Sequence, residues 1–138
     1  RDDVNSRSLV NAYSQALGTV FSQENKPFEV EILVVAIGVE GEKNEIYRIS
    51  FDGSIFDEKG FAAVGGKSET LVTRLKNRYS STPPSLQEAL RTSVEAVGEV
   101  NNQTLNAEGL EVAVLDRTQH GRAFRRLVSS ELASLLLA

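Results

Sequence analysis

Hydrophobic residues recur at helical spacing in four separate segments of this 138-residue chain. The first segment, residues 5–21, follows a start rich in Asp and Asn, which suits a helix cap. The same spacing recurs in residues 67–79, 85–97 and 129–137. Apolar residues three and four positions apart lie on one face of a helix, so the pattern predicts an amphipathic helix in each segment.

Specific residues mark the end of the second predicted helix and the start of the third. Pro83 and Pro84 prevent the second helix from continuing, because proline lacks a backbone N–H and clashes with the preceding turn. Ser85 then opens a capping box. Its hydroxyl oxygen is placed to accept from the backbone N–H of Glu88, while the Glu88 carboxylate reaches back to the N–H of Ser85.

Alternating and continuous apolar runs predict six strands. They are residues 28–38, 46–51, 54–57, 61–64, 110–116 and 122–128. Asp52-Gly53 lies between two of these runs and is a strong hairpin signal. The order is helix, four strands, two helices, two strands, helix, and the short connections favour antiparallel pairing.

Composition limits the classes of function. With 41% hydrophobic and 25% charged residues, the chain suits one globular domain over residues 1–138. A net charge of -4 argues against nucleic-acid binding. The absence of Cys excludes disulfides, thiolate metal sites and Cys nucleophiles, and it is compatible with a reducing cytoplasm. The longest apolar run, residues 32–37, fits a buried strand and is too short to span a membrane.

The stretch Gly65-Gly66-Lys67-Ser68 resembles the end of a phosphate loop, in which backbone amides surround phosphates and a lysine reaches their oxygens. That motif requires a glycine five residues before Gly66, where this chain has Phe61. Because the glycine register is wrong, we expect no nucleotide site here. A glycine pair that connects a strand to a helix is the preferred interpretation.

Other candidate groups have structural explanations. His120 is the single histidine and lies at a predicted hairpin tip, which is a poor place for a shielded catalytic base. Carboxylate pairs such as Asp57-Glu58 occur in turns, where solvation explains them, and the His and acidic residues lack metal-ligand spacing. In the basic run from Arg122 to Arg126, strand geometry places Phe124 and Arg125 on opposite faces, so an interface or a salt-bridged surface is favoured over nucleic-acid binding.

Several segments together resemble one protein family. They are KPFEVEILV (26–34), YRISFDGSI (47–55), FAAVGG (61–66), LEVAVLDR (110–117), RAFRRL (122–127) and the opening RDDVNSRSLVNAYSQALGTVFSQ (1–23). In this order they resemble the alpha subunit of the bacterial, actinobacterial-type 20S proteasome. The resemblance spans essentially the whole chain and corresponds to the later part of a family subunit. Because the chain starts at Arg1 with neither a Met nor a targeting segment, we expect its native beginning to be missing.

The resemblance implies an α+β fold, the N-terminal-nucleophile hydrolase-like four-layer αββα sandwich of antiparallel sheets. This chain would lack its amino-terminal strands and first helix. Both sheets would then be incomplete, and we expect the chain not to be a stable isolated monomer. Strands from another polypeptide or a second copy would complete the sheets.

The resemblance also implies a role. Family alpha subunits form heptameric rings in the cytoplasm, cap rings of proteolytic beta subunits, gate entry to the chamber and receive a ring-shaped ATPase. Substrates in such bacteria carry the protein tag Pup. Catalysis belongs to an amino-terminal Thr of the beta subunits, whereas this chain begins with Arg1 and departs from their Gly-Ser-Gly-Ser stretch at Gly66 and Lys67. We therefore expect a noncatalytic subunit with no catalytic, cofactor-binding or metal residues, and partners that include neither nucleic acid nor membrane.

Two other classes of function stay open at this stage. One is an N-terminal-nucleophile hydrolase whose nucleophile lies upstream of Arg1. The other is a stand-alone binding module without ring partners. The gene sequence upstream of Arg1 would test the first, and native mass spectrometry would test the second.

Overall fold

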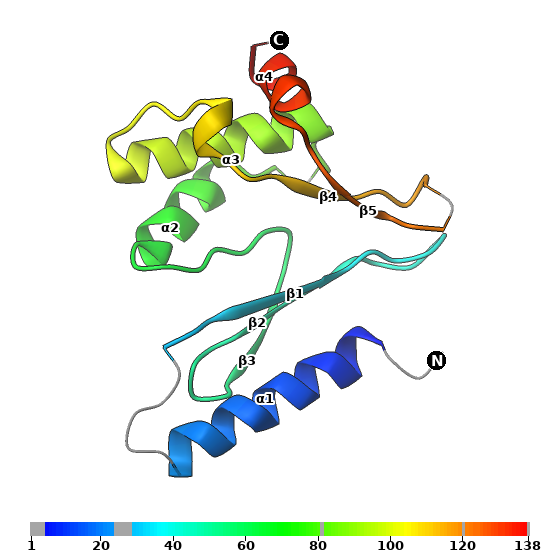
Figure 1. The fold of residues 1–138 in the computed structure, drawn as a ribbon, viewed down its shortest axis with the longest axis vertical. Helices are drawn as coiled ribbons and strands as arrows, with labels where there is room; N and C mark the ends of the chain where they lie inside the picture. Colours follow the sequence, from blue (N-terminus) through cyan, green and yellow to red (C-terminus); the bar gives the residue numbers. More distant parts are fainter. Residues whose placement is uncertain (1–4, 24–28, 81, 120, 138) are drawn as a thin grey trace. The chain divides into compact units, whose positions relative to one another are not determined.

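The computed structural model describes residues 5–23, 29–80, 82–119 and 121–137 of the chain (Figure 1). It contains two compact units, Arg1–Gly66 and Lys67–Ala138. Helices and antiparallel strands occur in both, so the expected α+β class is confirmed. The sandwich layering and the single domain stay predictions.

The described residues of the first unit form one helix and one sheet. The helix is α1 (Ser6–Gln23), and the strands β1 (Ile32–Ala36), β2 (Glu45–Ile49) and β3 (Ile55–Glu58) form an antiparallel sheet in the order β1-β2-β3. Figure 1 shows α1 along one face of this sheet. The helix therefore covers one face of the sheet, and no other described helix of this unit lies on the opposite face.

The core of the first unit lies between α1 and the sheet. Val10 and Leu17 of the helix pack with Val34 of β1 and Ile49 of β2, and Tyr47 packs against this group. Alternate residues of a strand point to the same face, which explains why Val34 is buried and its neighbours are more exposed.

The turn between β2 and β3 confirms the Asp52-Gly53 hairpin signal. Gly53 has φ 90°, a left-handed conformation that favours glycine. The Asp52 carboxylate accepts hydrogen bonds from the Ser50 hydroxyl (2.6 Å) and the Ser54 N–H (2.9 Å). These bonds, with the Ser50 hydroxyl contributing most, lower the pKa of Asp52 to about 2. The Ser14 hydroxyl of α1 donates to the Gly53 carbonyl, so the turn is fixed to the helix.

Among its described residues, the second unit has three helices, a short 3₁₀ turn and a two-stranded antiparallel ribbon. Its elements are α2 (Ser68–Arg78), α3 (Leu86–Asn101), η1 (Ala107–Gly109), β4 (Ala113–Leu115), β5 (Phe124–Arg126) and α4 (Ser129–Leu137). Its core forms around Leu90, Leu127 and Leu132. Of the helices in the described part of the chain, none combines the length and apolar character needed to cross a bilayer.

Helix α3 begins as predicted and ends later than predicted. Ser85 is its N-cap, and both hydrogen bonds of the capping box with Glu88 are present. We expected an end at residue 97, yet the helix continues through the buried Gly98 to Asn102, a left-handed C-cap with φ 53°. The Gln103 N–H donates to the Gly98 carbonyl and closes the helix end. Gly98 is needed for this closure because an added Cβ would lie 2.6 Å from the Gln103 carbonyl oxygen.

One predicted strand is wrong. Residues 61–64 form no strand, and none of the described strands pairs with them. A short apolar run becomes a strand only when a neighbouring strand supplies hydrogen bonds, so the pattern was insufficient. The other five predicted strands form with shortened or shifted bounds, and residue 28 of the first of them lies outside the described residues.

Candidate functional site

The groups of the Gly65-Gly66-Lys67-Ser68 stretch have structural roles. Gly65 has φ 119°, and Lys67 is the N-cap residue of α2. The Lys67 ammonium donates to the Val100 carbonyl at 3.3 Å, near the C-terminal end of α3. A helix C-terminus carries partial negative charge and attracts a cation, so Lys67 stabilises a helix end.

We expect no nucleotide binding at this stretch, because the glycine register is wrong and the Lys67 ammonium is bound to a carbonyl. Isothermal titration of ATP with magnesium into the protein should give no saturable heat. The Lys67→Ala variant is the matched control. Saturable binding that this variant abolishes would contradict the prediction.

The carboxylate of Asp116 stabilises the turn between β4 and β5. Asp116 accepts from the N–H (2.9 Å) and the hydroxyl (2.6 Å) of Thr118. The Thr118 hydroxyl contributes most to lowering the pKa of Asp116. His120 lies outside the described residues, so the prediction of a solvated histidine stays untested.

The basic run on β5 is divided between two faces, as strand geometry predicts. Val114 lies opposite Arg125 and Leu115 lies opposite Phe124 in the β4–β5 register. Arg125 forms an ion pair with Glu131 of α4, so part of this run is salt-bridged, as expected.

The first sheet has exposed apolar side chains on the face opposite α1, which we call the outer face. Leu33, Val35 and Phe56 lie on it and are about two-fifths exposed, at 39%, 46% and 41%. Arg48 lies among them, with its guanidinium carbon 4.0 Å from the centre of the Phe56 ring. The outer face is therefore apolar around one stacked arginine.

Two carboxylates compensate the charge of Arg48. Its Nη1 lies 3.3 Å from Glu31 Oε2 and its Nε lies 3.1 Å from Glu58 Oε1. Sequence reasoning assigned Glu58 to a solvated turn pair with Asp57, and it missed this cluster. The available signal was the position of Arg48 between Ile46 and Ser50 on one face of a strand whose other face is apolar.

In the second unit, ion pairs connect α2 to α3. Arg74 pairs with Glu99 at 2.9 Å, and Arg78 pairs with Glu95 at 3.2 Å and also with Glu99. No described residue of α2 is buried, so this helix depends on half-buried apolar contacts and these surface pairs. A pocket of about 590 Å³ lies beside them, and their charges are mutually compensated.

The described residues contain no group of three or more His, Asp or Glu that could hold a metal ion. The charged groups described above form ion pairs or hydrogen-bond within turns, and the outer face exposes apolar side chains. These features suit contact with other polypeptides.

Comparison with known proteins identifies the family. A model of the proteasome subunit family matches residues 2–115. The chain is 47% identical over 136 residues to the proteasome subunit alpha of Streptosporangium roseum, covering 99% of this chain and 52% of that protein. It is 43% identical over 141 residues to the proteasome subunit alpha of Salinispora tropica (99% and 54%) and 46% identical over 144 residues to that of Frankia casuarinae (99% and 60%).

The chain thus spans between half and three-fifths of the length of these relatives. The family match covers most of the chain and includes residues of both units. The chain belongs to the proteasome subunit family, and the relatives that it matches within that family are alpha subunits.

Proposed function

We propose that this chain acts as a noncatalytic, ring-forming structural subunit of a 20S proteasome core particle. The observation that carries the proposal is the similarity to proteasome alpha subunits along 99% of the chain. The apolar outer face of the first sheet supports it, because exposed apolar surface of this kind is typical of proteins that assemble.

On this proposal the chain acts in a heptameric alpha ring that stacks on a ring of beta subunits in the cytoplasm. The ring controls entry to the proteolytic chamber and receives a ring-shaped ATPase. Substrates are proteins that carry the Pup tag. The sequence resemblance to actinobacterial alpha subunits supports these parts of the proposal.

The proposed subunit takes part in proteolysis without catalysing it. In the described part of the chain, three candidate groups have structural partners: Lys67 binds a helix end, Asp116 closes a turn, and Glu58 pairs with Arg48. Such roles are compatible with a fold that has lost, or never had, a nucleophile.

Assembly and peptidase activity together test the proposal. We expect the protein expressed from its complete gene, together with a proteasome beta subunit, to form a ring complex that contains both chains in native mass spectrometry. The complex should hydrolyse fluorogenic peptides, whereas the alpha-type protein alone should not.

The control is a Thr-directed covalent inhibitor, which should abolish the activity of the complex by labelling only the beta subunit. Two results would contradict the proposal. One is a protein that stays monomeric beside beta subunits, and the other is inhibitor-sensitive hydrolysis by the alpha-type protein alone.

A further inference from the structure

A surface pocket of about 800 Å³ in the first unit has chemistry that the proposed ring role does not use. Its walls are residues 29–31, which precede β1, residues 64–66, which precede α2, and Phe51, which follows β2. All of these residues belong to the first unit. The pocket has the size of an ordinary ligand site.

The apolar part of the pocket is exposed. Phe51, Val30 and Val64 are 46%, 44% and 37% exposed. The Phe51 ring packs edge-on against Phe21 of α1, with ring centres 5.7 Å apart, and this contact fixes the position of the ring. Three apolar side chains around one open pocket suit a ligand with an aliphatic stem.

The charge of the pocket is negative. The Glu31 carboxylate is compensated by Arg48 at 3.3 Å. Glu29 also lines the pocket, and no cation pairs with it among the described residues. A cationic group on an aliphatic stem matches an exposed carboxylate beside apolar side chains, and lysine and arginine side chains have this form.

The main chain beside the pocket is open. No main-chain hydrogen bond is described for residues 64–66 within the part of the chain that the structure describes. A Cβ added at Gly65 or Gly66 would meet no atom within 4 Å. The main chain of a peptide can therefore approach these residues closely and hydrogen-bond to them.

We infer that this pocket binds an extended protein segment that presents a lysine or arginine side chain beside an apolar residue. The cationic group pairs with Glu29, and the aliphatic stem lies against Phe51 and Val30. The open main chain at Gly65 and Gly66 favours a peptide over a free amine, because a free amine has no backbone to pair.

The probe is a fluorescein-labelled peptide of sequence Gly-Val-Lys-Val-Gly-Gly, titrated against the protein in the assembly state in which it purifies. We expect fluorescence anisotropy to give a Kd on the order of 0.1–1 mM, typical of a small polar contact. The same peptide with norleucine in place of lysine should bind about two- to fivefold more weakly, as should the wild-type peptide to a Glu29→Gln variant.

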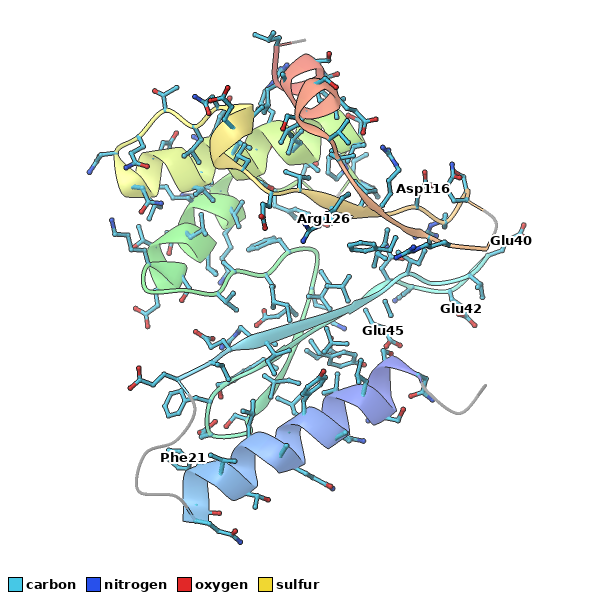
Figure 2. All side chains as sticks on the ribbon, in the orientation of Figure 1. Phe21, Glu40, Glu42, Glu45, Asp116 and Arg126 are labelled. Atoms are coloured by element: carbon cyan, nitrogen blue, oxygen red, sulfur yellow. The ribbon has the colours of Figure 1, made fainter. Side chains whose placement is uncertain are left out.

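Glu42→Gln is the matched control variant. Figure 2 shows Glu42 and Phe21 at opposite ends of the first unit, and Phe21 contacts the pocket residue Phe51. The Glu42→Gln variant should bind the peptide as the wild type does. A second variant, Gly66→Leu, adds a side chain where the backbone leaves open space, so it should obstruct binding without loss of stability.

Carbodiimide crosslinking locates the bound lysine, because it joins an amine only to a carboxylate in contact with it. Mass spectrometry should find the peptide on Glu29 or Glu31. Any of three results would overturn the inference: equal binding of the norleucine peptide, crosslinks only at carboxylates outside the pocket, or n-butylamine that competes at the same concentration as the peptide. The last result would assign the pocket to free amines.

Discussion

Replacement of Gly53 by alanine should lower the free energy of unfolding by more than about 3 kcal/mol. Gly53 has φ 90°, and an L-residue in this conformation costs about 1–2 kcal/mol. In addition, the new Cβ would lie 2.6 Å from the Ser14 carbonyl oxygen and 2.9 Å from the Gly18 nitrogen. Both atoms belong to the backbone of α1, so relief of the overlap requires the turn to move away from the helix.

Gly41→Ala is the matched control for this prediction. Gly41 has φ 84°, nearly the same conformation, and an added Cβ meets no atom within 4 Å. It should therefore show only the conformational cost, about 1–2 kcal/mol. Urea unfolding followed by circular dichroism, at matched protein concentration, measures both variants. Equal losses for Gly41→Ala and Gly53→Ala would show that the close approach of the turn to α1 contributes nothing.

Replacement of Ile49 by alanine should cost about 2–5 kcal/mol of unfolding free energy. Ile49 is 0% exposed, lies opposite Ile32 in the β1–β2 register and packs in the core with Val10 and Leu17 of α1. Truncation removes apolar burial and leaves a cavity between the helix and the sheet. The same unfolding experiment measures the loss.

Ile55→Ala removes the same atoms from the neighbouring strand. Ile55 lies opposite Ile49 in the β2–β3 register and is 42% exposed. Its loss should be less than about 1.5 kcal/mol, because much of the side chain is already in water. Both side chains lie on the face that α1 covers, so a larger loss for Ile55→Ala than for Ile49→Ala would contradict the placement of Ile49, and not Ile55, at the centre of this core.

Local sequence signals predicted the helices well because those signals act over a few residues. The last helix has the predicted bounds of 129–137, and the α3 N-cap at Ser85 follows from chemistry within four residues. The predicted end of α3 was wrong. Where this helix ends depends on how closely Gly98 approaches the Gln103 carbonyl, and composition does not reveal such a contact.

Strand pairing was predicted less well because it joins residues far apart in the chain. Residues 61–64 form a short apolar run of the kind found in buried strands, yet no described strand pairs with them. The Arg48 cluster needs Glu31 before β1 and Glu58 at the end of β3, and only the register of three strands brings these groups together. The family could be inferred nonetheless, because the resemblance uses residue identities along the whole chain and requires no register.

The ion pairs between α2 and α3 determine which turn of one helix lies beside which turn of the other. Arg74 and Arg78 are one turn apart, as are Glu95 and Glu99, and the two helices run in opposite directions. Sliding α2 by one turn, about 5.4 Å, would separate charges that now match, whereas aliphatic side chains would still find apolar neighbours. The alignment of this helix pair is thus encoded in charge more than in shape. Exchange of one aliphatic residue for another along α2 should preserve the alignment. Charge reversal at Glu99 removes the ion pairs with both Arg74 and Arg78.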